Sequence, residues 1–417
     1  MRHKSIHNYR PTILSLARPI VTMAVNSAPF AQGEAWFELL FGFREADVLK
    51  FRQEDGQVVR KPSQLREKLQ LRGDRLHSVV NGASYGAGTF STPTLAELRS
   101  ATAGLPSSRE LTLEHIATGD VFELHSRPEY RGSMFMAASQ FNCLEFPHPD
   151  VVPEDGVTNY VYDGTQGPAC ALAAPAAAVA RHYHVARSDG ERGQTEKSQL
   201  NLLGDLLMLV QGSAGEGSAG SAATAAGVDP VSVRNGYTSS DERRLGAFNR
   251  RLAALGVPHD ELLGALRIGL HSNVEVPWGP RRFELLPPAE RTTVSQTFCS
   301  ALAIGYSDGG AKAWEPLAKM VLDAAYEATL LAAALEHSTG RGSGVVLLTR
   351  LGGGVFGNEP AWIDGAIARA CLRASHLPLR VILCHFGAVD EGGRQRLDAA
   401  IDAERLRQTT PTLRSEL

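Results

Sequence analysis

The stretch VVLLTRLGGGVFGN at residues 345–358 indicates the fold. A short apolar run typical of a buried strand leads into three glycines, an aromatic residue and a fourth glycine. Apolar residues at helical spacing follow from Trp362 to Ala370, so the glycines lie where a strand gives way to a helix. Free peptide N–H groups at such a turn can bind an anion, although a plain chain reversal would use the same glycines. The residues predicted to line this loop are Gly352, Gly353, Gly354, Val355, Phe356, Gly357 and Asn358.

Apolar runs that suit strands alternate with helical patterns along the chain. The runs cover residues 132–141, 293–306, 344–351 and 379–386. The clearest helical pattern extends from Trp314 to about His337, with Pro316 in its first turn. This alternation predicts an α/β fold with a mixed, mostly parallel sheet.

The composition is that of an ordinary globular protein, with 417 residues, 43% of them hydrophobic and 21% charged. A net charge of -3 argues against nucleic acid or an anionic membrane as a partner. The five cysteines form no Cys-x-x-Cys pair, which favours reduced thiols and a cytoplasmic location. No apolar run approaches the roughly 18 residues that a membrane helix needs.

Changes in composition along the chain suggest its organisation. Residues 1–33 contain basic residues but no acid, which fits either a disordered tail or an organelle transit peptide. Residues 34–108 suggest a small α+β subdomain or lid, and residues 109–417 the main domain. Within the main domain, residues 187–288 resemble an insertion packed beside the core. Residues 211–227 are almost entirely Gly, Ser and Ala, which predicts a flexible loop inside this insertion.

A second glycine-bearing turn is expected at the same edge of the sheet. Asn142 and Glu145 follow the apolar run that ends near residue 141, and Thr165, Gln166 and Gly167 precede an Ala-rich helix with Pro168 at its first position. The free N–H groups of that helix start would point toward the ligand edge. We therefore predict that the two turns converge on one diphosphate.

These motifs together resemble the macro domain, an α/β/α module that binds ADP-ribose. The resemblance covers about half of the chain and extends, more distantly, to poly(ADP-ribose) glycohydrolases. It implies a three-layer α/β/α fold, to which the N-terminal α+β extension and the large insertion suggested by the composition are added. The matching segments are Gly119-Asp120, residues 138–142, 165–171, 294–299 and 326–330, and the glycine loop at 352–357.

The resemblance also implies roles for individual residues. Asp120 would accept a hydrogen bond from the adenine amino group, and Asn142 would hold the distal ribose. Backbone groups at residues 166–167 and 353–357 would bind the two phosphates, and Phe356 would stack on the distal ribose. No cofactor and no metal are implied.

Catalysis at the distal ribose would break a glycosidic bond, which requires an acid or base and a placed water. Glu145 is the first candidate and Asp163 the second, although Asp163 also suits a turn-forming role before Gly164. The family's doubled asparagine is reduced here to Gln140 and Asn142, and the paired glutamates of poly(ADP-ribose) glycohydrolases are absent. Hydrolysis of a single ADP-ribosyl bond is therefore expected rather than cleavage of the polymer.

Three functions remain open from the sequence. The first is a hydrolase acting on an ADP-ribosylated protein or small molecule, and the second is a non-catalytic reader of ADP-ribose or another nucleotide diphosphate. The third is a dinucleotide-dependent oxidoreductase, which is disfavoured because the glycines occur late in the chain rather than after the first strand. The sequence makes no prediction about the oligomeric state.

Overall fold

The computed structural model describes residues 34–52, 58–107, 111–187, 189–211 and 229–409. The predicted tail, residues 1–33, and residues 212–227 of the predicted loop lie outside these ranges.

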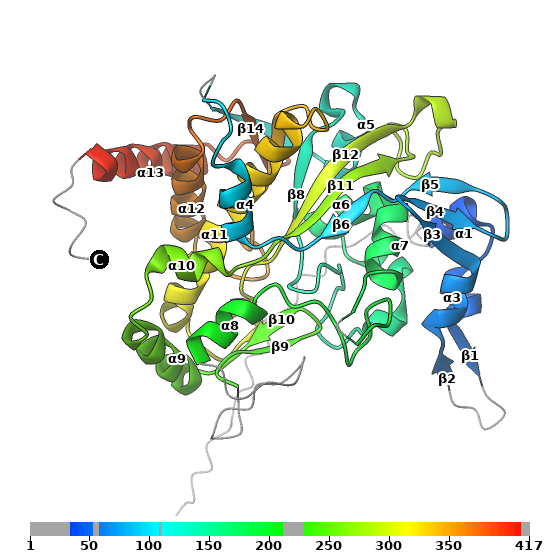
Figure 1. Cartoon of the computed structure of the whole chain (residues 1–417), viewed down its shortest axis with the longest axis horizontal. Helices are drawn as coiled ribbons and strands as arrows, with labels where there is room; N and C mark the ends of the chain where they lie inside the picture. The colour runs from blue at the N-terminus through cyan, green and yellow to red at the C-terminus, as the bar shows by residue number, and fades with distance from the viewer. Residues whose placement is uncertain (1–33, 53–57, 108–110, 188, 212–228, 410–417) are drawn as a thin grey trace, which may run out of the picture.

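A seven-stranded sheet in the order β6-β11-β12-β8-β13-β14-β7 lies at the centre of the molecule (Figure 1). Strands β12, β8, β13, β14 and β7 are mutually parallel, and β11 runs antiparallel to both of its neighbours. The predicted mixed, mostly parallel sheet is thereby confirmed. The strands are β6 (Thr89–Ser91), β7 (Thr112–Thr118), β8 (Met134–Ala138), β11 (Gly269–Val276), β12 (Thr292–Cys299), β13 (Val345–Leu348) and β14 (Arg380–Phe386).

The central strands are apolar along their whole length because helices cover both faces of the sheet. All but the last residue of β8 is buried, and so is all but the first of β13. The strands are shorter than the predicted runs. The run 293–306, for example, stops at Cys299, and the chain then turns into a short 3-10 helix, η5 (Ile304–Tyr306).

Two helical layers sandwich the sheet. On one face α11 packs on β8 and β13 and contacts α12 and α4, and α13 packs on α12. On the other, α6 packs on β8 and α7 on β11, with α5 beside α6. The sequence places Pro316 in the first turn of its helix, but α11 begins at Ala311 and Pro316 lies inside it. The helices are α4 (Leu95–Thr102), α5 (Val121–Ser126), α6 (Gln166–Ala173), α7 (Pro175–Tyr183), α11 (Ala311–Ser338), α12 (Pro360–Arg373) and α13 (Glu391–Thr409).

The remaining elements surround this sandwich. The N-terminal ones are α1 (Ala35–Phe41), α2 (Glu45–Leu49), β1 (Lys50–Arg52), β2 (Val58–Arg60), α3 (Pro62–Lys68), β3 (Leu69–Arg72), β4 (Arg75–Ser78) and β5 (Ser84–Gly86). Those of the expected insertion are α8 (Gly204–Gln211), β9 (Ser232–Arg234), β10 (Tyr237–Ser239), α9 (Glu242–Ala254) and α10 (His259–Gly264).

The central sheet includes one strand from the predicted N-terminal subdomain and one from the predicted insertion. β6 comes from residues 34–108 and β11 from residues 187–288, and the two pair with one another. The structure thus differs from the expectation of an insertion lying beside the core. Among the helices described, none is both long and apolar enough to cross a membrane.

Candidate functional site

The two glycine-bearing turns leave the sheet from neighbouring strands. Because β8 and β13 pair in parallel, the segments that follow them emerge at the same edge. We call residues 139–165 loop 1 and residues 349–359 loop 2. Tyr237 connects them: its hydroxyl donates to the Phe146 carbonyl of loop 1 at 2.6 Å, and its ring centroid lies 5.6 Å from that of Phe356 in loop 2. Loops 1 and 2 therefore leave the sheet at the same edge, with Tyr237 in contact with both.

Helix α6 begins directly after loop 1, with Thr165 as its N-cap. The Gln166 side-chain amide forms two hydrogen bonds, of 2.7 and 2.8 Å, with backbone groups of β8, and so holds the helix start against the strand. The backbone N–H groups of Gln166 and Gly167 have no partner inside the helix. Pro168 occupies the third helical position rather than the predicted first, because the helix starts at Gln166.

Gly167 is required by its close approach to two other groups. A Cβ atom at this position would lie 2.1 Å from the carbonyl oxygen of Ala138 and 2.3 Å from Oε2 of Glu145. Any side chain would therefore displace either the end of β8 or the Glu145 carboxyl group. The contact also shows that this carboxyl group lies directly against the first turn of α6.

Glu145 is completely buried, and its hydrogen bonding to the Ser139 hydroxyl is weak. Its side chain is 0% exposed, and among the described residues no group forms a hydrogen bond of standard geometry with either carboxylate oxygen. Burial raises the pKa of Glu145 from 4.5 to about 8, against the opposing effects of Ser139 and Arg181, and Asp163 adds to the rise. The raised pKa favours the protonated form of Glu145, which is the form that can donate a proton.

Arg181 supplies a buried positive charge near this carboxyl group. Its Nε donates to the Cys143 carbonyl at 2.7 Å, and its guanidinium carbon lies 3.6 Å from the ring centroid of Phe298. Burial lowers the pKa of Arg181, and Glu145 counteracts this effect. Arg181 is not among the site residues predicted from the sequence, where it appears only as a cation beside His182 at the end of an Ala-rich segment.

Comparison with known proteins returns solved structures only. No family model and no curated protein matches the chain. Poly(ADP-ribose) glycohydrolase from Thermomonospora curvata matches with 14% identity and a TM-score of 0.38, over 91% of this chain and 99% of that chain. The Deinococcus radiodurans enzyme in complex with ADP-ribose matches with 12% identity and a TM-score of 0.35, over 77% of this chain and 95% of that chain. These likenesses are distant, so the functional argument rests on the site itself.

Loop 2 presents a row of unused backbone donors. Gly352 and Gly357 have φ angles of 73° and 70°, which favour glycine and turn the chain at both ends of the row. Among the described residues, none accepts a hydrogen bond from the N–H groups of Gly354, Val355 or Phe356. Such donors are suited to an anion, as the sequence predicts.

Two other residues predicted for loop 2 act within the loop. The N–H of Gly353 donates to the Arg350 carbonyl at 3.1 Å. The buried Asn358 side chain donates to the Leu302 carbonyl at 2.8 Å. Both residues therefore fix the shape of the loop, and neither of these donors is available to a ligand.

Asn142, predicted to hold the distal ribose, is buried on the inner side of loop 1. Its Nδ2 donates to Gln199 at 2.8 Å, and its Oδ1 accepts from the N–H of Leu144 at 3.0 Å. Gly236, in the turn between β9 and β10, covers it so closely that a Cβ there would lie 2.6 Å from Oδ1. The role that the structure gives Asn142 is to shape loop 1.

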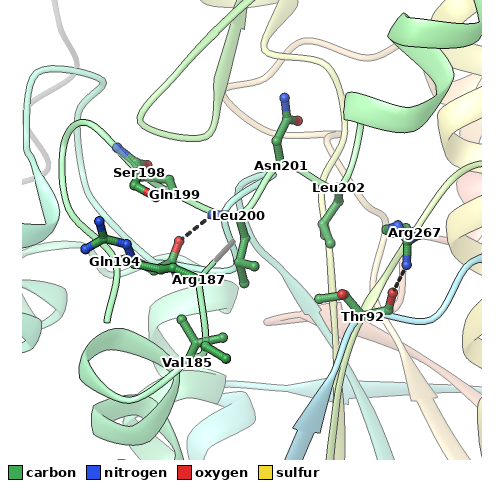
Figure 2. Close-up of a pocket in the computed structure, with 11 residues that line it drawn as sticks. Thr92, Val185, Arg187, Gln194, Ser198, Gln199, Leu200, Asn201, Leu202 and Arg267 are labelled. Carbon is green, nitrogen blue, oxygen red and sulfur yellow. Dashed lines mark hydrogen bonds between the residues drawn. The ribbon is translucent and has the colours of Figure 1, made fainter. Parts of the chain in front are cut away.

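A cavity of about 240 Å³ is lined by residues that include two hydrogen-bond partners of Asn142 (Figure 2). Two of its lining residues, Gln194 and Gln199, form hydrogen bonds with the backbone carbonyl and the side chain of Asn142. Neither Glu145 nor any residue of loop 2 lines it. This cavity therefore lies outside the two predicted turns.

The two predicted aspartates each have a structural task. Asp120 caps α5 by accepting from the N–H of Phe122 at 2.9 Å, and its other oxygen pairs with Arg282 at 3.2 Å. Asp163 accepts from the N–H of Thr165 at 2.8 Å, which is the turn-forming role that the sequence offered as its alternative. Both carboxylates keep lone pairs that a ligand could use.

Two exposed aromatic residues at the same edge were not selected from the sequence. Phe386, the last residue of β14, is 86% exposed, and Tyr306 is 41% exposed beside Phe356. Their position at or after the carboxyl end of a strand could have indicated them, since ligands of parallel sheets bind beyond these ends. Among the described residues, no group of three or more His, Cys, Asp or Glu side chains could hold a metal ion.

Proposed function

We propose that this protein binds an ADP-ribosyl group across loops 1 and 2 and hydrolyses the glycosidic bond at its distal ribose. The free N–H groups at residues 166–167 and 354–356 would donate to the diphosphate. Neutral donors suit this task because they add no unpaired cation to the site. Phe386, at the end of β14, offers its exposed face to the adenine, and Phe356 offers its face to the distal ribose.

The observation that carries the proposal is the position of Glu145. A buried carboxyl group with a raised pKa lies against the helix start that would bind the phosphates. It would donate its proton to the leaving atom as the bond to C1 of the ribose breaks. The resulting carboxylate would then accept a proton from the water that attacks C1, and Glu145 would return to its starting state.

A second function is favoured by one specific observation. Glu145 is 0% exposed beneath Gly167, so a bound substrate reaches it only if loop 1 moves. A protein whose loop 1 stays closed would bind ADP-ribose without cleaving anything. This is the reader function predicted as the alternative from the sequence.

Calorimetric titration tests binding, and product analysis separates the two functions. We expect saturable binding of ADP-ribose that AMP and NAD do not match, and release of ADP-ribose from mono-ADP-ribosylated peptides. Glu145→Gln should retain binding and lose turnover, whereas Glu123→Gln, an exposed change on α5, should keep both. Binding without turnover in the parent protein would establish the reader, and the absence of ADP-ribose binding would refute both functions.

A further inference from the structure

Glu45, on the N-terminal helix α2, places a buried carboxylate inside the main domain. Its side chain is 2% exposed. Oε1 accepts hydrogen bonds from the N–H of Val157 at 3.0 Å and from the hydroxyl of Tyr183 at 2.7 Å. Oε2 accepts from the N–H of Thr158 at 2.8 Å and from its hydroxyl at 2.6 Å. All four donors belong to residues more than a hundred positions further along the chain.

The backbone is shaped to receive this carboxylate. Val157 and Thr158 are the first residues of the 3-10 helix η3 (Val157–Tyr162), whose opening N–H groups lack internal partners. Gly156, just before it, has a φ of 104°, and a Cβ there would lie 2.5 Å from Oε2 of Glu45. Burial raises the pKa of Glu45, and the hydrogen bonds from Thr158, Tyr183 and Val157 oppose that rise.

The segment fixed by Glu45 leads directly into the proposed phosphate site. η3 ends at Tyr162, and residues 163–165 then form the turn into α6, whose first residues are Gln166 and Gly167. Tyr183 is the last residue of α7, which follows α6. Glu45 therefore fixes the chain both before and after the helix start that would bind the diphosphate. Other N-terminal elements support it, since α3, β4 and β5 pack against α7 (Figure 1).

We infer that Glu45 is a positioning residue that holds the N–H groups of Gln166 and Gly167 in place, which makes the N-terminal region part of the binding site. The inference rests on the proposed function and extends it. Glu45 has no contact to offer a ligand, because it is 2% exposed and both of its carboxylate oxygens already accept two hydrogen bonds from the protein. It would act through η3 and the turn that follows it.

Glu45→Gln is the sharpest test because it keeps the size of the side chain. In either orientation the new NH₂ group faces a backbone N–H, of Val157 or of Thr158, that cannot rotate to become an acceptor. We expect affinity for ADP-ribose to fall about tenfold or more, the effect of losing one hydrogen bond to a charged group. Affinity for adenosine, which has no phosphate, should stay within about twofold of the parent. Asp47→Asn, an exposed change of the same charge on α2, is the matched control.

Amide hydrogen exchange tests the positioning without any ligand. Glu45→Gln should accelerate exchange in residues 157–167 relative to Asp47→Asn. If Glu45→Gln does not fold, Tyr183→Phe, which removes one of the four hydrogen bonds, should show a smaller change in the same direction.

The outcomes separate the inference from the proposed function. Equal affinity of Glu45→Gln and Asp47→Asn for ADP-ribose, or an equal loss for ADP-ribose and adenosine, would overturn the positioning role. If the parent binds no ADP-ribose, the proposed function fails. In that case faster exchange in residues 157–167 still supports the positioning role, and unchanged exchange overturns it.

Discussion

Replacement of Glu145 by glutamine should change how the stability of the protein depends on pH. The pKa of Glu145 rises from 4.5 to about 8 on folding. Because the pKa of Glu145 is higher in the folded protein, its carboxyl group does not lower the free energy of unfolding below about pH 4.5. Above that pH the free energy of unfolding falls progressively, until the pH passes about 8. At about 1.4 kcal/mol per unit of pKa shift, ionisation of Glu145 lowers the free energy of unfolding by about 5 kcal/mol at high pH. About 1 kcal/mol of this loss is already reached at pH 5.

Glutamine removes the ionisation and keeps the shape. Its amide is also buried without partners, but that penalty does not vary with pH. The free energy of unfolding of Glu145→Gln relative to the parent should therefore increase by roughly 4 kcal/mol between pH 5 and pH 9. The charges of Arg181 and Asp163 act on the ionised carboxylate alone, so their effect is already contained in the raised pKa of Glu145.

Urea denaturation at pH 5, 7 and 9 measures this difference for the parent, Glu145→Gln and the exposed control Glu123→Gln. The control should show the same difference from the parent at every pH. If the difference between the parent and Glu145→Gln is also constant, the carboxyl group is not desolvated in the folded protein. The assignment of Glu145 as a proton donor would then lose its physical basis.

Three further changes test the site. Phe386→Ala should weaken the binding of ADP-ribose and adenosine, measured by calorimetry, about tenfold or more. The melting temperature should not change, because the ring is 86% exposed. Unchanged affinity would exclude stacking of the ring on the adenine. Gly167→Ala should lower the free energy of unfolding by about 1–3 kcal/mol. Gly354→Ala should leave the free energy of unfolding unchanged, because a Cβ there would meet nothing within 4 Å. An equal decrease for Gly167→Ala and Gly354→Ala would contradict the close packing at Gly167. Asn142→Ala should lower the free energy of unfolding by about 1–3 kcal/mol, and any loss of ADP-ribose affinity should be accompanied by faster amide exchange in loop 1. A large loss of affinity with unchanged exchange would instead support its predicted contact with the ribose.

The α/β architecture and the two turns could be predicted because local patterns determine them. Three glycines after an apolar run allow few alternatives to a turn, and the helix pattern from Trp314 to His337 lies within the observed α11. The membership of β6 and β11 in the sheet could not be predicted in this way. A three-residue strand such as Thr89–Ser91 has too little periodicity to show which sheet it joins, because its pairing depends on distant residues.

The candidate site shows the same division between local and long-range information. Its backbone donors were predictable, since an N–H at a glycine turn is available wherever the turn forms. The orientation of a side chain is decided by residues far away in sequence. Asn142 is covered by Gly236 and bonded to Gln199, and neither contact follows from its position after a strand. Burial likewise gives Glu145 its raised pKa, so spacing could select this glutamate but could not distinguish it from a solvated carboxylate. Glu45 is a further example of long-range information. It lies more than a hundred positions before the segment that it binds, so the sequence around the turn before α6 could not indicate it.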